Sequence, residues 1–227
     1  MYTLILLAGG KGLRMDNSIP KQYMMLAGKP MIIHSLERIN QLSFVSDIII
    51  VCSEEYIQAI NNLLVQYSID KKVFYARPGN TRQESVLSGL EKVKTNNVII
   101  HEAARPFVSI DDFKELIEYD APNVIIGSDI PFTVIRGDDQ VKGILTRSEL
   151  VNVQLPQKFE TELLRTAHLK AKNENITFTE DGSLLHFYYP DIVIKILKGK
   201  DYNIKITNRF DMLYGELIYD EVFRRRK

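Results

Sequence analysis

Residues 4–23 read LILLAGGKGLRMDNSIPKQY, an apolar run that changes abruptly into a loop with three glycines, two lysines, one arginine and a proline. The apolar run is typical of a strand that is buried on both faces. It is too short for a signal-peptide core or a membrane span. A strand followed by a glycine-rich basic loop predicts an anion site at the carboxyl edge of a sheet.

Further apolar runs alternate with segments of helical periodicity along the chain. The predicted strands are Thr3–Leu7, Asp47–Val51, Val73–Ala76, Val98–His101 and Val124–Ile126. Between them, apolar residues recur at helical spacing in the segments 32–39, 57–67 and 86–93. This alternation predicts an α/β fold in which helices cover both faces of a mostly parallel sheet.

The stretch 133–147, TVIRGDDQVKGILTR, interrupts the alternation. Two short β-prone runs flank Gly137, Asp138 and Asp139, which is typical of a β-hairpin. Because an isolated two-stranded hairpin is marginally stable in water, we expect it to pack on something else, such as a second subunit.

The last third of the chain predicts helices near residues 161–173 and 183–188, and a strand at 192–197. A final helix follows, with Asn208 and Asp211 as its cap. We expect the apolar side chains of this helix to face inward: Phe210, Leu213, Leu217 and Ile218.

Length and composition limit the class of protein and its partners. With 227 residues, 45% of them hydrophobic and 26% charged, we expect a single domain over 1–227 with a hairpin arm at about 132–152. The 29 basic and 29 acidic residues cancel, so no overall field attracts nucleic acid. We expect a cytoplasmic protein that binds neither nucleic acid nor membrane. The single cysteine, Cys52, excludes an internal disulfide.

Three kinds of phosphate site compete for the opening loop. A P-loop is excluded, because no glycine has the required spacing to a Gly-Lys-Ser/Thr run. A dinucleotide fingerprint starting at Gly10 is disfavoured, because its third glycine falls on Met15 and Pro20 interrupts a helix. The remaining option is an open loop whose N–H groups wrap a phosphate chain, with Arg14 and Lys21 supplying positive charge.

Here the sequence resembles a known family, the 2-C-methyl-D-erythritol 4-phosphate cytidylyltransferases and their relatives, the ribitol-5-phosphate cytidylyltransferases. The resemblance rests on the opening loop through PKQY and on three blocks that follow in order: GNTRQESVLSGL (79–90), HEAARPF (101–107) and NIKIT (203–207). It implies a Rossmann-like nucleotidyltransferase that transfers CMP from CTP to a polyol phosphate and releases pyrophosphate.

The resemblance also implies roles for particular residues. Arg14 and Lys21 become the catalytic cations. The implied CTP-binding residues are Ala8, Gly9, Gly10, Gly12, Gly79, Arg82, Ser85, Glu102 and Ala103. The implied acceptor-binding residues are Arg105, Thr133, Arg147 and Lys205. Mg²⁺ is the implied cofactor, held mainly by the CTP phosphates with Glu102 as a further candidate ligand. A homodimer is implied as well, in which Arg147 reaches the neighbouring site.

The chain departs from the family pattern at two positions, with Glu102 and Phe132 where aspartate is common. The motifs PKQY, TRQESV and AARP favour 2-C-methyl-D-erythritol 4-phosphate as the acceptor over D-ribitol 5-phosphate. Two readings outside this class are an NAD-dependent oxidoreductase and a relative that binds nucleotide without turnover. The four histidines are not spaced as metal ligands, and we expect them to be structural or surface residues.

Overall fold

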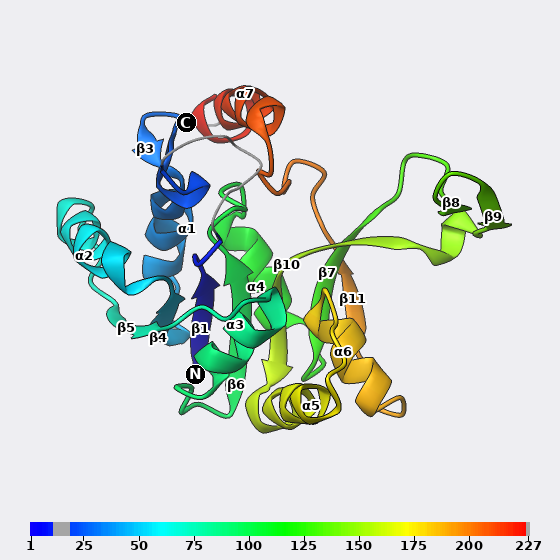
Figure 1. The fold of residues 1–227 in the computed structure, drawn as a ribbon. Coiled ribbons are helices and arrows are strands. Elements are labelled where there is room, and N and C mark those ends of the chain that lie inside the picture. The colour runs from blue at the N-terminus through cyan, green and yellow to red at the C-terminus, as the bar shows by residue number, and fades with distance from the viewer. Residues whose placement is uncertain (11–18, 226–227) are drawn as a thin grey trace.

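The computed structural model describes residues 1–10 and 19–225 and contains a seven-stranded sheet between two layers of helices (Figure 1). The strand order is β11-β7-β10-β6-β1-β4-β5. These strands are β1 (Tyr2–Leu7), β4 (Val45–Val51), β5 (Lys72–Ala76), β6 (Asn97–Glu102), β7 (Val124–Asp129), β10 (Val151–Glu160) and β11 (Lys195–Lys198). Two short pairs lie outside it: β2 (Met25–Leu26) with β3 (Lys29–Pro30), and β8 (Ile135–Gly137) with β9 (Val141–Ile144).

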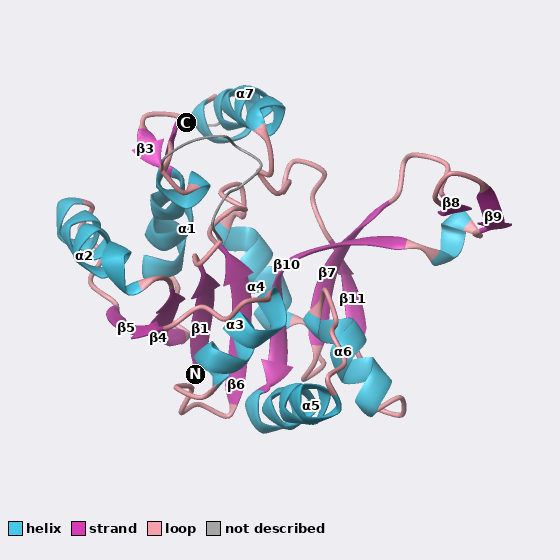
Figure 2. Ribbon diagram, viewed as in Figure 1, coloured by secondary structure: helices cyan, strands magenta, loops and turns pink. Residues whose placement is uncertain are grey.

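The helices, drawn in cyan in Figure 2, come after strands along most of the chain. The α-helices are α1 (Met31–Asn40), α2 (Ile57–Gln66), α3 (Arg82–Leu90), α4 (Ile110–Glu118), α5 (Thr161–Glu174), α6 (Asp181–Tyr188) and α7 (Arg209–Ile218). Shorter helical turns are η2 (Lys21–Tyr23), η3 (Glu54–Tyr56), η4 (Arg147–Glu149) and the π-helical η5 (Tyr219–Arg224). The predicted cap of α7 is confirmed as a capping box of Asn208 and Asp211, and α4 begins with a second capping box, formed by Ser109 and Asp112.

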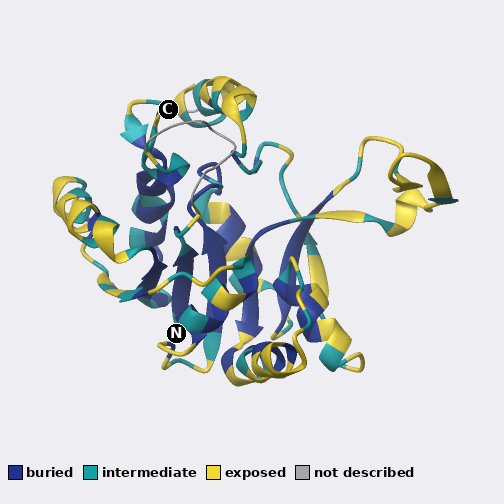
Figure 3. Cartoon of the chain, viewed as in Figure 1, coloured by how far each residue is buried: buried dark blue, intermediate teal, exposed yellow. Residues whose placement is uncertain are grey.

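The two helical layers follow from the alternation of side chains along β1. Leu4 and Leu6 point into a core shared with α1, α2 and α4. Ile5 points to the opposite face, into a core shared with α3, α5 and α6. Because both faces of the strand are covered, an almost unbroken apolar run is stable there. Figure 3 shows the resulting buried sheet between partly exposed helices. The predicted α/β class is confirmed.

Strand β10 is the feature of the sheet that the sequence did not predict. It runs antiparallel to both neighbours, β6 and β7, whereas all other neighbouring strands of the sheet are parallel. Gln154, Gln157 and Lys158 on this strand are buried, so it lacks an apolar run. Lys158 donates from Nζ to the carbonyl oxygens of Ile117 and Tyr119, which end α4.

The expectation that the apolar side chains of α7 face inward is wrong for three residues. Phe210, Leu213 and Leu217 are 81%, 62% and 63% exposed. Ile218 is buried, in a small third core with Phe107. The apolar residues of this helix extend around more than one face, and the core takes the side that carries Ile218.

The hairpin β8–β9 lies away from the sheet, between β7 and β10 in the sequence (Figure 1). Its strands pair antiparallel, with Ile135 opposite Ile144. Since β7 and β6 both run antiparallel to β10, they run in the same direction. The hairpin therefore leaves the sheet at the edge where β1 and β6 end.

Candidate active site

A pocket of about 580 Å³ opens at the carboxyl ends of β1 and β6, the edge at which parallel sheets bind ligands. The described residues that line it come from five segments of the chain. They are Leu7, Ala8, Gly9, Gly10, Lys21, Gln22, Gly79, Asn80, Thr81, Arg82, Ser85, Glu102, Ala104, Lys205 and Thr207.

Two glycines let the backbone segments of the pocket approach each other. A Cβ on Gly9 would lie 2.4 Å from Cβ of Pro78, and a Cβ on Gly79 would lie 2.2 Å from Cβ of Glu84. Either contact would force the chain apart. Gln22 supports the first segment, because its Nε2 donates to the carbonyl oxygens of Ala8 and Gly10.

Lys21 joins the opening loop to the other side of the pocket. It begins η2, directly after Pro20, and its Nζ donates to the carbonyl oxygen of Ile206 at 2.8 Å. The backbone N–H of Ile206 in turn donates to the carbonyl oxygen of Ala104. Lys21 and Lys205 therefore lie on segments that border the same pocket.

The loop before α3 is closed by its own side chains. Thr81 caps the helix by accepting from the N–H of Glu84. The hydroxyl of Ser85 accepts from the N–H of Gly79 at 3.1 Å and donates to the carbonyl oxygen of Thr81 at 2.9 Å. Gly79 and Ser85, two of the implied CTP-binding residues, are therefore in direct contact, and both line the pocket.

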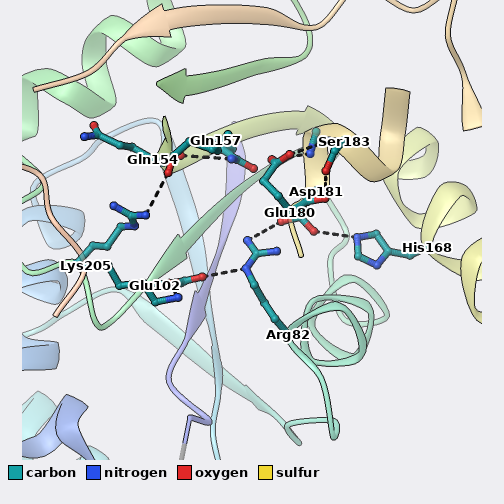
Figure 4. Close-up of polar contacts among 12 residues, drawn as sticks. Arg82, Glu102, Gln154, Gln157, His168, Glu180, Asp181, Ser183 and Lys205 are labelled. Carbon is teal, nitrogen blue, oxygen red and sulfur yellow. Dashed lines mark hydrogen bonds and ion pairs between the residues drawn. The ribbon is translucent and has the colours of Figure 1, made fainter. Parts of the chain in front are cut away.

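A chain of ion pairs runs along the pocket wall (Figure 4). Glu102 lies between two cations, with Oε1 2.9 Å from Nε of Arg82 and Oε2 2.6 Å from Nζ of Lys205. Burial alone would raise the pKa of Glu102, but the charges of Lys205 and Arg82 lower it to about 2. The carboxyl is therefore ionised near neutral pH, and both of its oxygens already face a cation.

The chain of ion pairs continues behind the pocket wall, where the sequence pointed to no site residue. Arg82 also donates from a terminal nitrogen to Oδ2 of Asp181 at 2.7 Å. Nε2 of His168 lies 3.0 Å from Oδ1 of the same carboxylate. Although burial would raise the pKa of Asp181, Arg82 and His168 hold it below its usual range. Both residues are buried and do not line the pocket.

The implied site residues divide into three groups. Those that line the pocket together are Ala8, Gly9, Gly10, Lys21, Gly79, Arg82, Ser85, Glu102 and Lys205. Gly12 and Arg14 lie outside the described residues. The remaining four are Ala103, Arg105, Thr133 and Arg147, and none of them lines the pocket.

These last four have other surroundings in the described chain. Ala103 is buried beside the lining residue Ala104. Arg105 donates to the carbonyl oxygens of Asn203 and Val153, so it ties the segment before Lys205 to β10. Thr133 and Arg147 are exposed on the hairpin.

Sequence reasoning missed several lining residues besides the ion-pair partners. Gln22 belongs to the PKQY motif but had no predicted role, although it holds the glycine loop. Asn80 and Thr81 lie between residues that were predicted, and Thr207 follows Lys205 by two. Because these residues are close in the sequence to predicted site residues, their place in the pocket could have been predicted. Asp181 and His168 had no such signal.

The described wall of the pocket offers few protein ligands for a metal ion. Glu102 is the only carboxylate among the described lining residues, and both of its oxygens contact cations. No group of three or more potential ligands that could hold a metal occurs in residues 1–10 and 19–225. In the same part of the chain, no helix has the length and apolar character needed to cross a membrane.

Comparison with known proteins connects this pocket to one family. The family model of 2-C-methyl-D-erythritol 4-phosphate cytidylyltransferase matches residues 2–221. The chain is 33% identical to the enzyme of that name from Halalkalibacterium halodurans, over 99% of both chains. It is 35% identical to the one from Clostridium novyi, over 96% of both chains.

A solved structure gives the same result for the fold. The crystal structure of 4-diphosphocytidyl-2C-methyl-D-erythritol synthase from Anaerococcus prevotii superimposes with a TM-score of 0.86 at 26% identity, covering 97% of this chain and 96% of that one. The chain therefore belongs to the 2-C-methyl-D-erythritol 4-phosphate cytidylyltransferase family.

Proposed function

We propose that this protein transfers the cytidylyl group from CTP to 2-C-methyl-D-erythritol 4-phosphate, in the synthesis of isoprenoid precursors. A phosphate oxygen of the acceptor attacks the α-phosphorus of CTP. The bond from that phosphorus to the oxygen bridging the α- and β-phosphates breaks, and pyrophosphate leaves with the electron pair. A phosphate monoester is mostly ionised near pH 7, so its oxygen needs no general base.

The observation that carries this proposal is the set of charges around the pocket. Lys21, Arg82 and Lys205 line it together with a single described carboxylate, so the described wall has excess positive charge. Fixed cations stabilise the charge that develops on a transferring phosphoryl group and on its leaving group. No described feature of the pocket favours an NAD-dependent oxidoreductase in the way that these cations favour phosphoryl transfer.

Each residue has a role in the proposed reaction. Lys21, and Arg14 by the resemblance, neutralise the triphosphate as the α–β bond breaks. Gly79 and Ser85 bind the cytosine, with the close backbone approach that Gly79 permits. Lys205 binds the acceptor phosphate from the opposite wall. Mg²⁺, when bound to the CTP phosphates, would supply a further positive charge at the leaving group. Glu102 then acts through Arg82 and Lys205 rather than as a metal ligand.

The hairpin supports a further part of the proposal, a homodimer in which Arg147 of one subunit reaches the site of the other. Phe132, Val141 and Ile144 are 76%, 70% and 91% exposed, which is unusual for large apolar side chains so close together in sequence. Contact with a second copy would bury them. Because CTP is an intracellular nucleotide, the proposal includes a cytoplasmic location.

The test is a pyrophosphate-release assay with Mg²⁺, CTP and one acceptor at a time. We expect kcat/KM to be higher with 2-C-methyl-D-erythritol 4-phosphate than with D-ribitol 5-phosphate, since discrimination is differential transition-state binding. A preference for ribitol phosphate would move the protein to the related activity. Release from neither acceptor, with CTP still bound, would identify a nucleotide-binding relative without turnover.

A further inference from the structure

Arg82 is held from both sides, and only one of its two partners lines the pocket. Its Nε donates to Glu102, a lining residue, and a terminal nitrogen donates to Asp181, which lies behind the wall (Figure 4). The Arg82 side chain is 22% exposed and that of Asp181 is 1% exposed. Arg82 lines the pocket, and its orientation is therefore fixed in part by Asp181, which does not line the pocket.

His168 completes this arrangement from a third helix. It lies on α5, is fully buried, and its Nε2 is 3.0 Å from Oδ1 of Asp181. A carboxylate only accepts, so the ring carries a proton on Nε2 and donates it. Nδ1 has no hydrogen-bond partner among the described residues. The only polar contact of this imidazole in the described structure is thus directed at the Asp181 carboxylate.

A second set of contacts attaches the same two parts of the chain to each other. Gln83, the neighbour of Arg82, donates from Nε2 to the carbonyl oxygen of Ile176 and accepts from the N–H of Phe178. The segment 176–181 is therefore fixed to the first turn of α3 at two consecutive residues. That turn follows directly on the loop that contains Gly79. Gly79 before the helix and Ser85 within its first turn both line the pocket.

The alternation of charge also favours a positioning role. Lys205, Glu102, Arg82 and Asp181 form a row of alternating cations and anions, with His168 at its buried end. Buried ion pairs contribute little net stability compared with apolar side chains of similar size, because their desolvation offsets their attraction. The contribution of this row is therefore to position. Because it leads from buried His168 and Asp181 to the pocket, it fixes where the side chains of Arg82 and Lys205 lie.

From this geometry we infer that Asp181 and His168 are positioning residues for Arg82 and, through it, for the loop that binds CTP. The inference rests on the proposed function for the identity of the nucleotide. Neither residue lines the pocket. They act on CTP only through Arg82, so CTP bound beside Arg82 changes the electrostatic surroundings of Asp181 and His168 in turn.

The test compares three variants at His168 and Asp181 with a matched control. His168→Leu removes the donor to Asp181, His168→Gln keeps a donor of similar reach, and Asp181→Asn removes the charge that faces Arg82. The control is His34→Leu, since His34 is also buried and donates from Nε2 to one acceptor, the carbonyl oxygen of Leu26, outside the row. For each variant, kcat, the KM for CTP and the melting temperature are measured.

We expect His168→Leu and Asp181→Asn to raise the KM for CTP roughly tenfold, the lower end of the effect of removing an outer-shell partner of a metal ligand. The value of kcat should change less, because the lost organisation affects nucleotide binding in the ground state. His168→Gln should recover most of the affinity. The control should lower the melting temperature and leave the KM unchanged. If His168→Leu behaves like the control, the role is only structural and the inference is wrong.

A measurement on the wild-type protein covers the case in which a variant does not fold. The ring-nitrogen NMR signals of His168 should shift when CTP is added, whereas those of His34 should not. Unchanged His168 signals at saturating CTP would overturn the inference. Calorimetry of CTP binding separates the two proposals: a wild type that binds CTP without transferring it refutes the proposed function alone.

Discussion

The pocket wall and the hairpin show opposite arrangements of polar and apolar side chains. Around the pocket, charged groups such as Asp181 are buried at 1% exposure, each with partners from other elements. On the hairpin, Ile144 is 91% exposed, and among the described strands its own strand, β9, pairs only with β8. The wall is thus specified by contacts within one chain, whereas the hairpin has apolar side chains that the described chain does not cover.

The sharpest way to test this comparison is to truncate one apolar side chain in each region. Phe113→Ala should cost about 3–5 kcal/mol of unfolding free energy, because Phe113 is fully buried in the core under α4. Ile144→Ala should cost less than about 0.5 kcal/mol at protein concentrations low enough for the chain to be monomeric, as exposed substitutions do. Urea unfolding measures both. If the cost at Ile144 grows with protein concentration, a second subunit covers the hairpin. A large cost at every concentration would contradict its exposure.

A second test asks how much of the chemistry belongs to the wall. Lys21→Ala should lower kcat by roughly 10²-fold or more, the effect of removing one donor that stabilises developing negative charge, with a smaller effect on CTP affinity. Lys92→Ala is a matched control, because Lys92 is exposed and does not line the pocket. Steady-state kinetics give kcat and the KM for CTP of both variants. Near-normal turnover of Lys21→Ala would leave the lysine with a structural role, such as its hydrogen bond to the carbonyl oxygen of Ile206.

A third test asks whether the hairpin completes the site of another subunit. Arg147→Ala and Lys21→Ala should each be nearly inactive as homodimers. A mixed dimer contains one site with Lys21 intact and Arg147 donated by the Lys21→Ala subunit. Mixing the variants under subunit exchange should therefore restore up to about half of the wild-type activity per mixed dimer, by symmetry. Continued inactivity after confirmed exchange, or an active monomer, would contradict the arrangement.

The smallest expected effect concerns acid stability. The folded-state pKa of Glu102 is lowered to about 2, below its unfolded value, so ionised Glu102 stabilises the fold above the unfolded pKa. That contribution is lost as pH falls from about 4.5 towards 2. The difference in unfolding free energy between wild type and Glu102→Gln should therefore shrink over that interval. A difference that stays constant would show that the charge of Glu102 contributes no stability.

The sequence predicted those parts of the fold whose signals are local. Continuous apolar runs located β1, β4, β5, β6 and β7, and the predicted hairpin strands pair with each other. Strand β10 was missed because Pro156 interrupts it and its buried side chains include Gln157 and Lys158. Lys158 is acceptable there because two distant backbone carbonyls, those of Ile117 and Tyr119, accept its hydrogen bonds, and no local pattern shows that.

The candidate site divides in the same way. The glycine loop and Lys21 were predicted from residues that lie close together in the sequence, and Gly79, Arg82 and Ser85 were predicted from the resemblance that their block carries. Asp181 is 99 residues from Arg82, and its function depends on how α6 is placed against α3. Lys205 and Glu102 were predicted separately, one for each substrate, whereas the structure joins them in an ion pair.

The antiparallel direction of β10 has a consequence for how this fold can be varied. Because β7 and β10 run in opposite directions, the segment between them leaves and re-enters the sheet at the same edge. Residues can be added to or removed from it, two at a time, without changing the register of any strand in the sheet. The length of the hairpin can therefore change independently of the sheet. Chimeras that exchange residues 131–150 should keep the parent pocket while acquiring a different reach.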